Sequence, residues 1–199
     1  MHISEGILSA PVLTGGAVIA VAATAAGLRK LSPEKIPQAG LLSAAFFVAS
    51  LVHVPLGPAS VHMVLNGIVG LLLGWAAVPV IAVALLLQAV LFQFGGITSL
   101  GVNTIIMAAP AVLCHYLFKP FLSKSHTLVM AAAFACGAAA VFLSALIAAA
   151  ALVLTGEAFR EVSAALVGAH VFVMIIEGIV TMFCVAFLKK VQPSMLNLD

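Results

Sequence analysis

Residues 128–154 read LVMAAAFACGAAAVFLSALIAAAALVL, a continuous apolar stretch without a charged side chain. A helix needs about 20 consecutive, largely apolar residues to cross the hydrocarbon core of a bilayer. This stretch exceeds that length, and it therefore predicts a membrane-spanning helix.

The rest of the chain has the same character. Of its 199 residues, 64% are hydrophobic and 7% are charged, whereas soluble domains carry about 25% charged residues. The composition predicts an all-α, polytopic membrane protein with one transmembrane domain over residues 1–199. We expect seven transmembrane helices, at about residues 10–28, 39–52, 61–76, 78–94, 102–118, 128–154 and 162–188.

The basic residues predict the orientation of these helices. With the N-terminus outside, the cytoplasmic segments hold seven of the eight lysines and arginines, namely Arg29, Lys30, Lys35, Lys119, Lys124, Lys189 and Lys190. Cytoplasmic loops of membrane proteins carry such an excess of positive charge. We therefore expect an external N-terminus and a cytoplasmic C-terminus.

Several function classes find no support in the sequence. The net charge of +2 and the lack of a basic aromatic patch argue against nucleic-acid binding. The chain has no GxxxxGK[ST] segment for ATP hydrolysis and no HExxH motif, so we do not expect an enzyme. The basic pair Arg29-Lys30 follows the first apolar run instead of preceding it, unlike in a signal peptide. We therefore expect Met1 to be retained.

The first six residues, Met1-His2-Ile3-Ser4-Glu5-Gly6, form a candidate metal chelate. The Met1 amine, the deprotonated His2 amide and the His2 imidazole can bind one ion through a five-membered and a six-membered ring. A fourth nitrogen would complete a planar set, which suits Ni(II), Cu(II) or low-spin Co(II). The alternative is an ordinary polar terminus.

Three short segments are expected on the outer face: residues 1–6, 53–60 and 95–101. They would surround an external pocket, with residues 1–6 inserted as a metal-binding plug. His62 is the preferred fourth ligand and His53 is its rival. In the last predicted helix, His170 and Glu177 are seven residues apart and share a face. They could move protons or ions, or Glu177 could pair with a hydroxyl between helices.

Three stretches together resemble one known family: residues 1–6, residues 55–62 (PLGPASVH) and residues 95–104 (GGITSLGVNT). The chain is similar to the CbiM/NikM family, the substrate-capture (S) components of energy-coupling-factor importers for cobalt and nickel. The resemblance implies a prokaryotic cytoplasmic (inner) membrane protein that transports Co²⁺ or Ni²⁺, for cobalamin biosynthesis or a nickel enzyme. It also implies a transmembrane coupling (T) subunit, two cytoplasmic ATPase subunits and a small accessory membrane protein as partners, with no bound organic cofactor.

The resemblance also implies a ligand set. It consists of the Met1 amine, the His2 amide and imidazole, and His62, whereas the family position that matches His53 is usually lysine or asparagine. Residues expected to orient the ligands or hold the plug are Glu5, Ser60, Thr98 and Asn103. The loop before His62 is one residue shorter than is usual in the family, and Glu5 resembles the cobalt branch.

Two other functions remain open at this stage. A self-sufficient carrier or channel would use Glu177 and His170 as a relay for cations or protons. A scaffold membrane protein would leave His2 without a role. Uptake without an ATPase would favour the carrier, and absence of metal binding would favour the scaffold.

Overall fold

The structure, a computed structural model, describes residues 2–51, 53–56 and 59–196, with the backbone alone for residues 53–56, 59 and 60. Its α-helices are α1 (Ala10–Leu28), α2 (Ile36–Ala49), α3 (Asn66–Leu73), α4 (Ala77–Phe92), α5 (Leu100–Phe118), α6 (His126–Thr155) and α7 (Arg160–Val191). Two strands, β1 (His53–Leu56) and β2 (Ala59–His62), pair between α2 and α3. Short 3₁₀ turns lie at Pro33–Lys35, Gly74–Ala76, Lys119–Phe121, Glu157–Phe159 and Pro193–Leu196.

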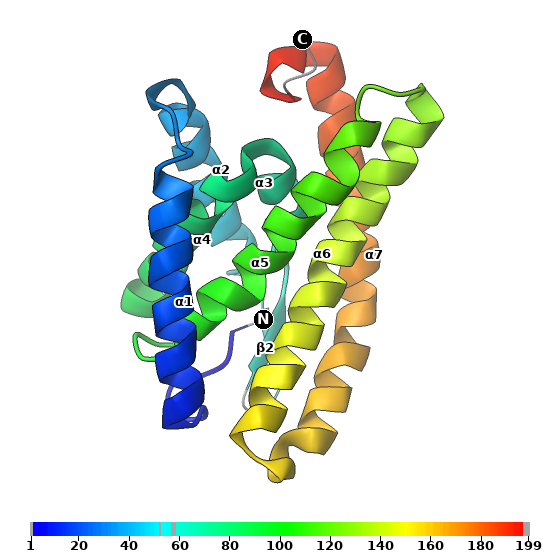
Figure 1. Ribbon diagram of the computed structural model, residues 1–199. Coiled ribbons are helices and arrows are strands. Elements are labelled where there is room, and N and C mark those ends of the chain that lie inside the picture. The colour runs from blue at the N-terminus through cyan, green and yellow to red at the C-terminus, as the bar shows by residue number, and fades with distance from the viewer. Residues whose placement is uncertain (1, 52, 57–58, 197–199) are drawn as a thin grey trace.

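The short helix α3 lies at the centre of the molecule. All eight of its residues are buried, and it packs against α5 and α6 (Figure 1). Glycines allow this close packing, because a Cβ atom added at Gly70 would lie 2.1 Å from the carbonyl oxygen of Ala111 on α5. The long helices α6 and α7 run side by side along one edge of the bundle (Figure 1).

Five helical segments are long and apolar enough to cross a membrane: Ala10–Leu28, Asn66–Phe92, Leu100–Phe121, His126–Thr155 and Glu157–Val191. The prediction of a helical, multi-pass membrane protein is confirmed. The finer prediction of seven transmembrane helices is not confirmed, because α2 has 14 residues and α3 has eight, followed closely by α4.

The structure corrects the third predicted helix. We expected a helix from about residue 61 to residue 76, but Val61 and His62 belong to strand β2, and α3 begins at Asn66. The strands pair antiparallel, with His53 opposite His62. Pro55, Gly57 and Pro58 disfavour a helix here, and pairing lets the backbone satisfy its polar groups within the protein.

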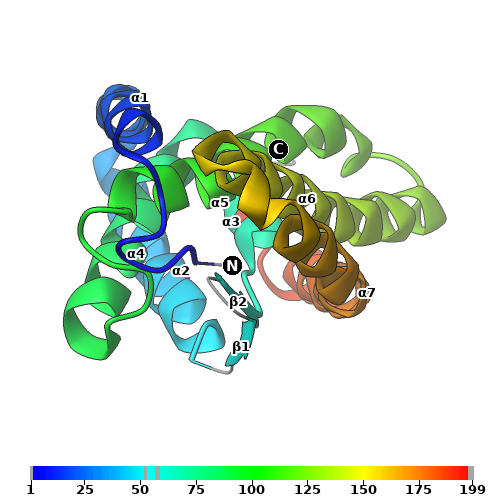
Figure 2. The same ribbon diagram turned by 90° about the horizontal axis from the view of Figure 1, so that it is seen from below.

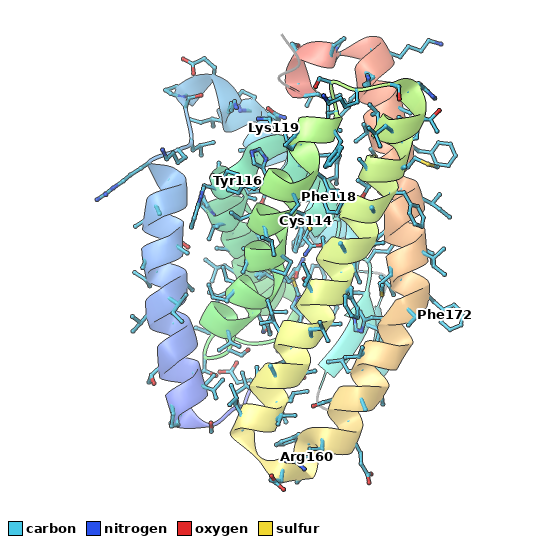
Figure 3. All side chains as sticks on the ribbon, turned by 45° about the vertical axis from the view of Figure 1, so that its right-hand side comes forward. Cys114, Tyr116, Phe118, Lys119, Arg160 and Phe172 are labelled. Carbon is cyan, nitrogen blue, oxygen red and sulfur yellow. The ribbon has the colours of Figure 1, made fainter. Side chains whose placement is uncertain are left out.

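The outer surface of the bundle is apolar. Val18 and Val21 on α1 are each 71% exposed, and Phe172 on α7 is 75% exposed and points away from the bundle (Figure 3). Such side chains suit contact with lipid. Lys119 and Arg160 lie at opposite ends of the molecule (Figure 3). The Lys119 end is also where α1 and α7 finish (Figure 1), so it gathers seven of the eight basic residues.

Candidate metal site

The N-terminal segment folds into the protein instead of extending away from it. It reaches the middle of the space between α5, α4, α7 and the hairpin, as the view from below shows (Figure 2). His2 is 3% exposed and Ile3 is fully buried. Residues 2–6 are therefore folded into the protein, whereas Met1 lies outside the described part of the chain. That this segment is a metal-binding plug stays a prediction.

Asn103, in the first turn of α5, holds this segment through its backbone. The Ile3 N–H donates to Oδ1 of Asn103 at 2.9 Å, and Nδ2 of Asn103 donates to the Ile3 carbonyl at 3.1 Å. One side-chain amide thus satisfies both backbone groups of Ile3, as a neighbouring strand would. Nδ2 also donates to the hydroxyl of Ser99, the residue before α5.

Glu5 binds the loop before α5. Its carboxylate accepts hydrogen bonds from the backbone N–H groups of Ile97 at 3.0 Å and Thr98 at 3.3 Å. The loop approaches closely because residue 96 is glycine: its φ is +144°, and an added Cβ atom would lie 2.0 Å from Oε2 of Glu5. The segment is therefore held at two points, Ile3 and Glu5.

His2 and His62 meet inside the protein. Their ring centroids are 4.5 Å apart with an angle of 27° between the planes, and both residues are buried. The strand β2 ends at His62, so the hairpin delivers this residue to the plug. The two histidines preferred as ligands are therefore brought together, although 60 positions separate them in the chain.

The His2 ring is oriented by a chain of polar side chains. Nε2 of His2 lies 2.6 Å from Oε1 of Gln88 on α4. Gln88 in turn donates to the hydroxyl of Ser50, which donates to the carbonyl of Phe47 on α2. A six-membered chelate ring with the His2 amide requires Nδ1, so the nitrogen that contacts Gln88 is the one that the chelate does not use.

His62 presents a nitrogen without a partner. Its Nδ1 lies 2.6 Å from the Met63 carbonyl, and its buried Nε2 has no hydrogen-bond partner among the described residues. Histidines that bind metals usually donate the other ring N–H to a carbonyl or carboxylate. Burial lowers the pKa of His62 well below its usual value, so this imidazole is neutral at pH 7 and Nε2 can bind a metal.

Comparison with known proteins identifies the family of the chain. Residues 2–195 match the family described as the cobalt uptake substrate-specific transmembrane region, CbiM. The chain belongs to the CbiM family. It is therefore a component of cobalt or nickel transport and not an enzyme.

Relatives of this CbiM-family chain carry the names of metal transport proteins, and one of them matches nearly its whole length. A putative metal transport protein of Haemophilus influenzae is 42% identical over 99% of this chain and 97% of its own length. A fused nickel transport protein NikMN of Rhodobacter capsulatus is 41% identical over 54% of this chain and 33% of its own length. The crystal structure of a transition metal transporter aligns with a TM-score of 0.78 and 25% identity, covering 96% of this chain and 93% of that one.

The remaining predicted residues occupy different places in this CbiM-family fold. Thr98 is exposed, and its backbone N–H, not its side chain, binds Glu5. His53 and Ser60 are described by their backbones alone, in β1 and β2. Sequence reasoning missed Gln88, Ser50 and Ser99, because an isolated amide or hydroxyl within an apolar helix or a loop gives no motif.

Glu177 and His170 are both fully buried in α7. Nδ1 of His170 lies 2.7 Å from the Leu166 carbonyl of its own helix. Glu177 accepts hydrogen bonds from the backbone amides of Val64 and Leu65. One of the sequence-based alternatives expected a hydroxyl partner, and no such partner is found for it among the described residues. Within the described residues, no group of three or more His, Cys, Asp or Glu side chains could hold a metal.

Proposed function

We propose that this chain is the substrate-binding membrane component of an energy-coupling-factor importer, and that it captures Co²⁺ or Ni²⁺ with four nitrogens. These are the Met1 amine, the His2 amide, Nδ1 of His2 and Nε2 of His62. The observation that carries this proposal is the stacked, buried pair of His2 and His62, in which Nε2 of His62 has no hydrogen-bond partner within the described part of the chain.

The chemistry of this donor set suits the proposed ions. Four nitrogens in a plane favour Ni(II) and low-spin Co(II) over Zn²⁺ or Mg²⁺. Two of these donors belong to the backbone and the α-amine, so the site needs only two histidine side chains. This explains how a site can exist although no cluster of three ligating side chains is found among the described residues.

The contacts of the plug support the same proposal. If Nδ1 of His2 binds the ion, Nε2 carries the proton and donates a hydrogen bond to Oε1 of Gln88, which is 2.6 Å away. Asn103 and Glu5 fix the register of the segment by binding Ile3 and the loop before α5. These contacts keep the backbone amide of His2 at a fixed position relative to His62, as an ion shared by both residues requires.

Energy for uptake would come from partners. The chain carries no P-loop for ATP hydrolysis, so we expect it to work with a transmembrane coupling (T) subunit, two cytoplasmic ATPase subunits and a small accessory membrane protein. The fused NikMN relative supports additional components in this family. We place the chain in a prokaryotic inner membrane, with residues 1–6 and the hairpin outside and the basic end in the cytoplasm.

Metal binding to the purified full chain with its authentic N-terminus tests the site. Bound cobalt and nickel are measured by elemental analysis after removal of free ion, for the native chain and for a chain acetylated at the Met1 amine. Acetylation keeps every side chain but removes the amine lone pair from the chelate. Lys124→Gln, which removes another amine in the turn before α6, is the matched control.

We expect one equivalent of metal in the native chain and in the control, and loss of tight binding in the acetylated chain. Equal binding in all three proteins would exclude the amine as a ligand. Metal uptake into vesicles that contain this chain without ATPase subunits would instead support a self-sufficient carrier, with Glu177 and His170 as its candidate relay.

A further inference from the structure

Glu177 reaches from α7 to the chain segment that follows His62. Its Oε1 accepts hydrogen bonds from the N–H groups of Val64 at 2.5 Å and Leu65 at 3.0 Å, and Oε2 also accepts from Leu65 at 3.0 Å. Both oxygens of this buried carboxyl group therefore accept from backbone amides. These amides lie just before the start of α3.

This contact holds an unusual turn. Leu65 has a φ of 56° and a ψ of 13°, the left-handed region that residues other than glycine seldom adopt. Such a conformation persists only where the surrounding structure enforces it. Because Glu177 binds the amides on both sides of the Val64 Cα atom, it fixes the turn between β2 and α3 to α7.

One peptide group connects this carboxylate to the metal site. The carbonyl of Met63 lies 2.6 Å from Nδ1 of His62, and the N–H of the same peptide group, which belongs to Val64, donates to Glu177. A peptide group is planar, so the position of the carboxylate sets the direction of the carbonyl. Hydrogen bonds in a chain also polarise one another, which strengthens the carbonyl as an acceptor.

We propose that Glu177 is a positioning residue for the metal site: through the Met63–Val64 peptide, it sets the orientation and the donor strength of Nε2 of His62. The proposal rests on His62 being a ligand, as argued above. Glu177 does not touch the ion. In many metal sites a carboxylate holds the metal-binding histidine directly, whereas here one peptide group lies between Glu177 and His62. Because Glu177 belongs to α7, this contact links metal affinity to the placement of α7.

A double-mutant cycle on the full chain tests this link. Dissociation constants for Ni²⁺ are measured for the native chain, E177Q, H62A and the double variant, together with the ligand-field absorption of the bound ion. We expect E177Q to weaken binding by about 10- to 100-fold and to shift the absorption band. In the H62A background, we expect E177Q to change the constant by less than about twofold.

The outcomes separate the two proposals. If E177Q weakened Ni²⁺ binding equally with and without His62, the proposed role of Glu177 would be overturned, because its effect would then not act through His62. An H62A variant that binds as tightly as the native chain would instead remove His62 from the ligand set. Ser163→Ala is the control, since Ser163 is also buried in α7 but bonds to the carbonyls of Ala149 and Phe159.

A second measurement needs no variant at Glu177 and applies even if E177Q fails to fold. Coupling between two sites is reciprocal, so metal binding at His62 should strengthen the bonds from Val64 and Leu65 to Glu177. We expect Ni²⁺ to slow hydrogen exchange of these two amides by about tenfold or more in the native chain, but not in H62A. Unchanged exchange in the native chain with bound metal would overturn the proposal.

Discussion

The side chain of Asn103 pairs with the backbone of Ile3 in both directions, with N···O distances of 2.9 and 3.1 Å. A residue of α5 thus completes the backbone hydrogen bonding of a segment 100 positions earlier in the chain. The pairing leaves the neighbouring His2 directed at Gln88 and stacked on His62. The depth of the plug in the protein therefore depends on this amide together with the Glu5 contacts to the loop before α5.

Replacing Asn103 by alanine should release the plug. Both backbone groups of Ile3 would lose their partners inside the protein, and each buried polar group left without one costs about 1–3 kcal/mol. We expect weaker Ni²⁺ or Co²⁺ binding, by about 10- to 100-fold, measured by titration of the purified chain. Thr104→Ala is the control, because the Thr104 hydroxyl donates to the Leu100 carbonyl within α5. Similar losses of metal affinity in both variants would argue against a specific role of Asn103 in holding the plug.

Gln88→Met should disturb the orientation of His2. Methionine has a similar volume but lacks the amide group that accepts a hydrogen bond from Nε2 of His2 and donates one to Ser50. Loss of a partner that fixes the ring of a metal-binding histidine typically weakens binding by about 10- to 100-fold. We expect such a loss in metal titrations, and no change in Gln192→Met, at the end of α7. Native affinity in Gln88→Met would show that this contact does not orient a ligand.

Gly96→Ala should separate Glu5 from its loop. The new methyl group would lie 2.0 Å from Oε2 of Glu5, and the φ of +144° is unfavourable for alanine. We expect weaker metal binding and faster proteolysis of the N-terminal segment. Gly168→Ala serves as the control, since nothing lies within 4 Å of its added Cβ atom and alanine favours a helix by up to about 1 kcal/mol.

Metal binding should release protons in a pH-dependent manner. Binding removes one proton from the His2 amide at any pH, and one from the Met1 amine at any pH where that amine is protonated. A free α-amine is protonated below about pH 8. The lowered pKa of His62 means that its imidazole is already neutral and releases none. We expect release of about two protons per metal near pH 6.5 and about one near pH 9, so affinity rises with pH.

Calorimetry in buffers of different ionisation enthalpy measures this release. A chain acetylated at Met1 is the control, because the acetylated nitrogen carries no titratable ammonium proton and no free amine lone pair for the metal. Release of about three protons near pH 6.5 would show that one imidazole of the ligand set, at His2 or at His62, is charged before binding. Release of fewer than one at pH 9 would remove the His2 amide from the ligand set.

The sequence by itself determined the class of protein and the main elements. Continuous apolar runs such as residues 128–154 can only be buried in a bilayer or a helical core, and the structure has helices in all seven predicted stretches. The boundaries of α1 agree with the prediction because Pro11 and Arg29 mark its ends in the sequence. The histidine at position 2 also predicts chelation from local sequence alone, since the sizes of the chelate rings depend only on adjacent covalent bonds.

Only the tertiary structure decided how the site is assembled. The hairpin that carries His62 depends on pairing between residues 53–56 and 59–62, and an apolar pattern cannot distinguish a short buried strand from a helix start. Gln88 and Glu177 have no motif of their own. Their roles arise because α4 and α7 bring them to His2 and to the Met63–Val64 peptide, and a contact across the fold is set by packing, not by local sequence.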